Sequence, residues 1–245
     1  MVNVKEIIKY LDEKYPEELR AVWDSTDGFL QGDSGSNVNT IGVGLEINKD
    51  FVEGEFDLLV LHHPPKFGKD KIVTNPFYAK LKEELPIYTL HSRIDVSGDL
   101  NKSIATVFFE KFIVDKVLDD GTVIISLEEE ENLSEIVESL KLKLDISKLK
   151  VIEKNNYVKK IAIHGGEGFN QHHVEKAVNE GIDLYLAGDL NHHLAEFASF
   201  YNVTFIDINH ISEQLGMRDV CKNLQKKFPD CVFKYINTRP YWVLK

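Results

Sequence analysis

The chain has 245 residues, of which 43% are hydrophobic and 28% are charged, as in globular proteins with one large domain or two smaller ones. Its formal net charge of −11 argues against a nucleic-acid-binding protein, unless its 29 lysines and arginines gather on one surface. The two cysteines exclude a disulfide scaffold. The lack of a signal sequence and of an apolar run of about 18 residues predicts a cytoplasmic protein without a membrane segment.

Helical and strand patterns alternate along the first half of the chain. The spacing of apolar residues predicts an amphipathic helix over residues 4–15, and a second helix is expected near 75–84. Residues 41–47 alternate between apolar and small or polar side chains, as a half-buried strand does. The wholly apolar run 58–61 predicts a buried parallel strand, and a further short strand is expected at 86–90.

The second half of the chain continues this alternation. Strands are predicted over residues 121–126, 157–163, 182–187 and 203–208, with a closing strand between 231 and 243. The acidic run at 128–131 is interpreted as a helix start, because carboxylates are favoured at that end of the helix dipole. The repeated alternation of strands and helices indicates an α/β fold with largely parallel sheets.

A change in the character of the sequence predicts a domain boundary near residue 118. The first α/β domain is expected to comprise residues 1–118 and to be completed by 205–245. Residues 119–204 are expected to form the second α/β domain.

Most histidines of the chain follow predicted strands. Seven of the nine stand at or just past a strand end: His62, His63, His91, His164, His192, His193 and His210. His172 and His173 are expected to open a helix and to face solvent. Because open α/β sheets bind ligands beyond the carboxyl ends of their strands, this distribution favours a metal or catalytic site over ordinary hydrogen-bonded histidines.

Carboxylates follow two of these histidines at short spacing. Asp95 lies four residues after His91, and Glu213 lies three residues after His210, which would place the latter pair on one face of a helix. Imidazole and carboxylate ligands together suit zinc, manganese, iron or nickel and exclude a soft thiolate site.

A glycine-rich turn, residues 164–168, separates a predicted strand from a predicted helix. Its backbone amides could cradle an anion, but Glu167 would repel a phosphate. A tight turn that lets the helix pack close to the sheet is the alternative.

Five short motifs occur in order along the chain: Trp23-Asp24, the Leu-His-His-Pro run at 61–64, His91-x-x-x-Asp95, the Gly-Asp-x-x-His-His run at 188–193, and His210-x-x-Glu213. Together they resemble the Nif-three-like family, whose members are called homologues of GTP cyclohydrolase I type 2. The resemblance implies two α/β domains with mainly parallel mixed sheets, a dinuclear metal site in the cleft between the domains, and a toroidal homohexamer.

The resemblance also implies a set of site residues. The family's metal ligands correspond to His62, His63, Asp95, His210 and Glu213. They would hold two divalent transition-metal ions, with His91 and His193 close by as catalytic groups that shuttle protons. The family usually spaces its late histidine and glutamate by four residues, so Gln214 occupies the usual place of the glutamate.

Two functions are compatible with such a site. The first is a metal-dependent hydrolase of the GTP cyclohydrolase kind, in which a metal-activated water attacks a nucleotide-like small molecule. The alternative is a ring-shaped scaffold or nucleic-acid-binding protein with a structural or regulatory metal site, although the net charge opposes nucleic acid. Its basic lining could come from Lys66, Lys69 and Lys71, or from Lys141, Lys143, Lys148 and Lys150.

Overall fold

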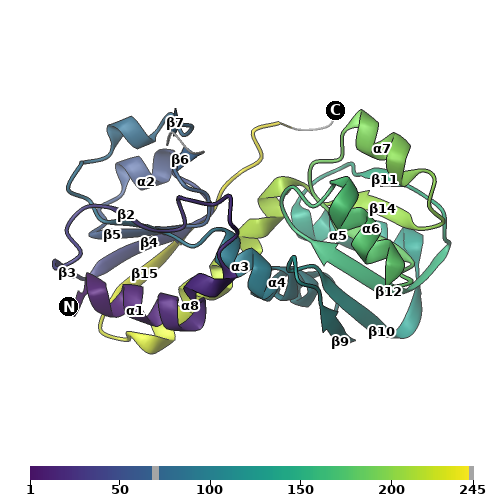
Figure 1. The fold of residues 1–245 in the computed structure, drawn as a ribbon, viewed down its shortest axis with the longest axis horizontal. Helices are drawn as coiled ribbons and strands as arrows, with labels where there is room; N and C mark the ends of the chain where they lie inside the picture. The colour runs from purple at the N-terminus through teal and green to yellow at the C-terminus, as the bar shows by residue number, and fades with distance from the viewer. Residues whose placement is uncertain (68–71, 243–245) are drawn as a thin grey trace. The chain divides into compact units, whose positions relative to one another are not determined.

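The structure is a computed structural model that describes residues 1–67 and 72–242 of the chain (Figure 1). The chain forms two compact units. The first comprises Met1–Ser97 with Gly216–Thr238, and the second comprises Gly98–Leu215 with the segment that starts at Arg239. Each unit is built around one mixed sheet, so the protein is an α/β protein with two mixed sheets.

The sheet of the first unit has five strands in the order β15 (Val232–Ile236), β4 (Thr40–Gly44), β5 (Leu58–Leu61), β8 (Ile87–Thr89) and β2 (Gly28–Gln31). The first four strands run parallel, and β2 pairs antiparallel with β8. All four residues of β5 are buried, as expected for a central parallel strand whose two faces are both covered.

Helices cover both faces of this sheet (Figure 1). The longer ones are α1 (Val4–Lys14) and α8 (Gln214–Lys227), and the shorter ones are α2 (Lys49–Glu53) and α3 (Ser92–Ser97). A capping box between Asn3 and Glu6 starts α1, and the buried face of that helix carries Val4, Ile7 and Leu11. Phe51 of α2 belongs to the same apolar cluster as residues of β5 and β8.

Short elements complete the first unit. They are β1 (Val2–Asn3) with β3 (Asn37–Val38), β6 (Lys66–Phe67) with β7 (Ile72–Val73), and the 3-10 turns η1 (Glu17–Leu19) and η2 (Tyr78–Lys80). The helix predicted near 75–84 is therefore wrong, because only the single turn η2 forms there. Pro76 is the second residue of this stretch and Pro86 lies two residues beyond it, and each disfavours helical backbone in the residue before it.

The sheet of the second unit has six strands in the order β11 (Lys150–Ile152), β14 (Thr204–Asp207), β13 (Leu184–Ala187), β12 (Tyr157–His164), β10 (Val123–Asn132) and β9 (Phe112–Val117). Only β12–β13 and β13–β14 are parallel. The other pairings are antiparallel, so this sheet is less parallel than predicted. The connection from β9 to β10 is a short turn, which is too short for the crossover that parallel neighbours need.

The helices of the second unit are α4 (Asp99–Phe108), α5 (Leu133–Leu144), α6 (Gln171–Asn179), α7 (His192–Ala198) and the 3-10 turn η3 (His210–Glu213). Phe169, Tyr185 and Phe205 contact one another by their rings in the core of this unit. The acidic run 128–131 lies in the exposed end of β10 rather than in a helix, so its interpretation as a helix start is wrong. Helix α5 begins only after it, where Asn132 caps the backbone amide of Ser134.

The division into units differs from the predicted domain boundaries. The second unit begins at Gly98 rather than near residue 118, because α4 contacts β12 and α5, and β9 pairs with β10. Strand β14 remains in the second sheet, and the chain returns to the first unit only from Gly216. In the described part of the chain, no helix has the length and apolar character needed to cross a bilayer.

Candidate metal centre

Three histidines of the first unit lie together at the carboxyl ends of two neighbouring strands. His62 and His63 directly follow β5, and His91 comes two residues after β8, which pairs parallel with β5. The ring centroid of His62 lies 4.9 Å from that of His63 and 5.1 Å from that of His91. One nitrogen from each of the three rings can lie within 4.8 Å of the other two, which is close enough for one metal ion.

The backbone fixes the tautomer of His62. Its Nδ1 lies 2.9 Å from the carbonyl oxygen of Leu90, and a carbonyl can only accept a hydrogen bond, so Nδ1 carries the proton. Nε2 therefore carries the lone pair that a metal ion needs, and it lies 3.6 Å from Oδ1 of Asp95 in α3. His62 is fully buried, so packing holds the ring in this orientation.

A carboxylate orients His91 in the same way. Oδ2 of Asp24 lies 2.8 Å from Nδ1 of His91, and Thr26 donates two further hydrogen bonds to Asp24. Burial disfavours the charge of Asp24, but the hydrogen bonds from His91 and Thr26 hold its pKa well below its usual value. The ionised carboxylate therefore accepts from Nδ1, and Nε2 of His91 is the nitrogen that can bind a metal or a proton. Trp23 contacts the same ring edge-to-face.

Sequence reasoning missed a second carboxylate in this group. Oε2 of Glu46 lies 3.5 Å from Nδ1 of His63. Glu46 stands two residues beyond the end of β4, which neighbours β5 in the sheet. Its position just past a strand end was the available signal, since the same criterion singled out the histidines.

In the second unit, His210 and Glu213 are brought together by η3. The Nε2 of His210 lies 3.2 Å from Oε2 of Glu213, and its Nδ1 lies 2.6 Å from Oδ2 of Asp189. In a 3-10 helix, residues three apart lie one above the other, so the three-residue spacing of this motif suits the observed helix type. Glu213 is buried beside His210, whereas Gln214 already begins α8.

The electrostatics of His210 follow from its two carboxylates. Burial disfavours the charged imidazolium, but Glu213 and Asp189 outweigh that effect and raise the pKa of His210 to about 11. Glu213 and Asp189 thus stabilise positive charge at this position. A bound metal cation would be stabilised by the same attraction.

Two glycines, Gly166 and Gly188, allow the backbone to pack directly against Glu213 and His210. Gly166 has φ +63°, and a Cβ there would overlap the carboxylate of Glu213. A Cβ at Gly188 would overlap the carbonyl oxygen of Gly166 and lie 2.9 Å from the backbone nitrogen of His210. The glycine-rich turn 164–168 is therefore a close-approach turn, and the group that it approaches is the side chain of Glu213 rather than a helix packed on the sheet.

The remaining predicted histidines have different surroundings. His193 lies in the first turn of α7 and is exposed, and its proton-shuttling role stays a prediction. His173 was expected to face solvent, but it is half-buried and bonded to Asp120, so that expectation is wrong. Asp120, His164 and His173 form what we call the second histidine cluster, which the sequence did not reveal. Burial lowers the pKa of His164 to about 3, so its imidazole is neutral.

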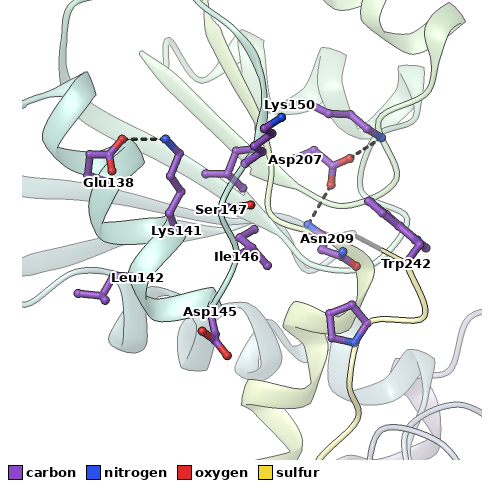
Figure 2. A pocket seen from close by; sticks show the side chains of 13 residues that line it. Glu138, Lys141, Leu142, Asp145, Ile146, Ser147, Lys150, Asp207, Asn209 and Trp242 are labelled. Carbon is purple, nitrogen blue, oxygen red and sulfur yellow. Dashed lines mark hydrogen bonds and ion pairs between the residues drawn. The ribbon is translucent and has the colours of Figure 1, made fainter. Parts of the chain in front are cut away.

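The second unit also contains a cavity of about 810 Å³, lined by the end of α5, the loop to β11, the end of β14 and the segment around Trp242 (Figure 2). Asp207, one of the lining residues, accepts hydrogen bonds from Nζ of Lys150 (3.1 Å) and from the backbone nitrogen of Asn209 (2.9 Å). Asn209 directly precedes His210 in the sequence.

The lysines expected to form a basic lining are mostly neutralised. Lys141, Lys148 and Lys150 line the cavity together with Glu138, Asp145 and Asp207, so the positive and negative groups balance. Figure 2 shows Lys141 paired with Glu138 and Lys150 with Asp207. Lys143 instead donates to the carbonyl of Phe108. Lys69 and Lys71 lie outside the described residues, and Lys66 stands over the ring of Tyr78.

Comparisons with known proteins identify the family of this chain. The family model described as Duf34/NIF3 (NGG1p interacting factor 3) matches residues 2–240. A Campylobacter jejuni protein named GTP cyclohydrolase 1 type 2 homolog is 26% identical over 98% of this chain and 99% of its own. Helicobacter pylori GTP cyclohydrolase 1 type 2 is 23% identical over 93% of each chain. The crystal structure of a Staphylococcus aureus hypothetical protein has the same fold, with a TM-score of 0.85, 21% identity and 99% of each chain covered.

Proposed function

The chain belongs to the Duf34/NIF3 family, and on that premise we propose that it is a metal-dependent hydrolase that binds two divalent transition-metal ions. The names of its relatives from Campylobacter jejuni and Helicobacter pylori suggest a purine nucleotide such as GTP as the substrate class. His62, His63 and Asp95 of the first unit and His210 and Glu213 of the second are the proposed ligands.

The group of His62, His63 and His91 carries this proposal. Three imidazoles converge at a strand edge, and hydrogen bonds hold Nδ1 of His62 and of His91, so that two proposed nitrogen ligands and the proposed proton carrier are arranged before any ion binds. Asp95 adds an oxygen donor within 3.6 Å of Nε2 of His62. Nitrogen and oxygen donors of this kind suit zinc, manganese, iron or nickel.

When bound, a divalent ion would lower the pKa of a water molecule and so supply a nucleophile near neutral pH. Side chains of the protein would accept and donate the protons. His91 is suited to accept a proton at Nε2, because the ionised Asp24 at its Nδ1 stabilises the resulting imidazolium, as the carboxylate of a catalytic triad does. We propose His193 as a second proton carrier, at the exposed start of α7.

Metal content and hydrolysis measured on the same samples test this function. The wild type, reconstituted with zinc, manganese, iron or nickel, should bind two ions at its proposed ligands and should hydrolyse GTP or a related nucleotide. Asp95→Asn should lose metal and turnover, whereas Asp99→Asn, a matched change at a partly exposed aspartate on α4, should retain both. An Asp95→Asn variant with full metal content and full activity would refute the assignment.

The alternative is a ring-shaped scaffold that binds nucleic acid or a protein. The pairing of Lys141 and Lys150 with carboxylates does not favour an anionic partner. A metal-loaded wild type that hydrolyses no member of a nucleotide and phosphoester panel, but binds an oligonucleotide in a salt-sensitive manner, would support this alternative.

A further inference from the structure

The second histidine cluster lies entirely within the second unit and shares no residue with the proposed centre. Asp120 belongs to the turn that precedes β10, His164 is the last residue of β12, and His173 lies in the first turn of α6. The turn that carries Asp120, 53 residues before His173 in the sequence, is thus brought beside the two imidazoles. One atom from each residue can lie within 4.8 Å of the other two.

Hydrogen bonds hold all three side chains in place. The Nδ1 of His173 lies 2.7 Å from Oδ2 of Asp120, and the backbone amide of Thr122 donates to Oδ1 of Asp120 at 3.0 Å. The hydroxyl of Thr122 lies 2.7 Å from Nδ1 of His164. Thr122 is fully buried, and Asp120 and His164 are nearly so, which makes this a preformed group rather than a set of mobile surface side chains.

The protonation states suit a cation. Burial opposes the charge of Asp120, but the hydrogen bonds from His173 and Thr122 hold its pKa well below the usual value, so the carboxylate is ionised. Because an ionised carboxylate only accepts, Nδ1 of His173 carries the proton and Nε2 carries the lone pair. The neutral imidazole of His164 stacks on that of His173, with ring centroids 4.1 Å apart and planes tilted by 33°.

If this group served only to hold the β9–β10 turn against α6, the hydrogen bond between His173 and Asp120 would be sufficient. Here a second, buried imidazole adds another nitrogen donor beside the first. Two imidazoles and a carboxylate are a common ligand set for zinc, with distances of about 2.0–2.2 Å from the ion to nitrogen and oxygen. Donor atoms around one such ion lie roughly 3.4 Å from one another, so small rotations of these side chains would suffice.

We propose that Asp120, His164 and His173 form a further binding site for a divalent transition-metal ion of the zinc type, separate from the proposed hydrolytic centre. The ion would fasten the β9–β10 turn to α6 and would leave one coordination position for water. Its role is to stabilise the second unit.

One neighbouring charge limits the affinity of this site. The Nζ of Lys176 lies 3.9 Å from Oδ2 of Asp120, although its hydrogen bond goes to Asp119 at 2.5 Å. An ammonium group at this distance repels a cation, so this site should bind more weakly than the proposed centre. Lys176→Met should therefore strengthen metal binding by roughly two- to fivefold, the scale of a partly exposed charge interaction.

Cobalt binding in a variant that lacks the three histidine ligands of the proposed hydrolytic centre tests the site. The triple variant His62→Ala, His63→Ala, His210→Ala should still bind one Co²⁺ per chain, seen by its visible absorption, and Co²⁺ should raise its unfolding temperature. Adding His173→Gln, whose amide can still donate to Asp120, should abolish both effects. His172→Gln is the matched control, since His172 is the exposed neighbour, and it should change neither effect.

Two results would overturn the proposal. One is a folded triple variant, judged by circular dichroism, that binds no cobalt at excess metal. The other is cobalt binding that persists with both His164→Gln and His173→Gln. If the triple variant does not fold, the same comparison in the wild type decides, because His173→Gln should then hold one ion fewer than His172→Gln. Hydrolytic activity plays no part in these readouts, so they are independent of the proposed function.

Discussion

At the scale of single residues, the partner of each imidazole nitrogen decides what the ring can bind. The carbonyl of Leu90 holds the Nδ1 proton of His62, and Asp24 holds that of His91. In both rings Nε2 is left with its lone pair. A histidine without such a partner would have to select its tautomer and orientation when the metal binds, at a cost in free energy.

Asp24→Asn tests this orientation. The amide can present its NH₂ group to Nδ1 of His91, which favours the opposite tautomer and places the proton on Nε2. We expect the rate of nucleotide hydrolysis to fall about 10²–10⁴-fold, the usual scale for a lost general acid or base, while metal content stays unchanged. Steady-state kinetics and elemental analysis of the metal-loaded variant measure both quantities. Asp219→Asn, at a partly exposed position on α8, is the control, and equal rates for the two variants would contradict the role of Asp24.

Gly166→Ala tests the close approach of the glycine turn to Glu213. A methyl group there would overlap the Glu213 carboxylate, so the side chain must move and metal affinity should fall. Gly181→Ala is a matched control, because Gly181 has a similar φ of +71° but a methyl group there would meet no atom within 4 Å. Both variants should lose about 1–2 kcal/mol of stability from the left-handed conformation. Only Gly166→Ala should also lose affinity; the same loss in both would contradict the contact.

At the scale of elements, a buried arginine joins the parts of the first unit that carry Asp95 and Asp24. Arg93 lies in α3 and is 2% exposed. Its Nε donates to Asp27 at 2.9 Å, and its Nη1 donates to the carbonyl of Tyr15 just beyond α1 and to Asp12 within that helix. Helix α3 is only six residues long, so these contacts, rather than its own hydrogen bonds, fix its position.

Arg93→Met should destabilise the protein by about 3–5 kcal/mol, because the carboxylate of Asp27 would be left buried without its partner. Denaturant unfolding followed by circular dichroism measures the change. Lys9→Met, which removes an exposed member of an ion pair on α1, should cost less than about 1 kcal/mol. A small effect of Arg93→Met would show that the network does not hold α3 in place.

At the scale of the whole molecule, the prediction concerns assembly. The family resemblance implies a closed ring, and closed symmetry is the usual form of soluble homo-oligomers. Light scattering of the full chain at micromolar concentration should therefore report a mass several times the 28.0 kDa of one chain, with a hexamer as the expected species. A mass of one chain at every concentration would refute this expectation.

The sequence by itself determined the features that local patterns encode. The apolar run at β5, the alternation of strands and helices, and the positions of His62, His63, His91 and His164 at or just past strand ends depend on neighbouring residues, and all of them are found in the structure. His192 and His193 instead begin α7, five residues beyond β13. The ordered motifs identified the family, which the family model confirms. The helix predicted near 75–84 is wrong, because Pro76 within this stretch and Pro86 just after it disfavour helical backbone in the residues before them.

Only the tertiary structure decided which groups form hydrogen bonds with the histidines. Asp24 and His91 are 67 residues apart, and Asp120 and His173 are 53 apart. No periodicity links residues at such separations, because their contact depends on strand order and on the turns between elements. The same holds for the mixed pairing of the second sheet and for Glu46 beside His63. Local spacing specifies a side chain's face and its place on an element, whereas the fold specifies its partner.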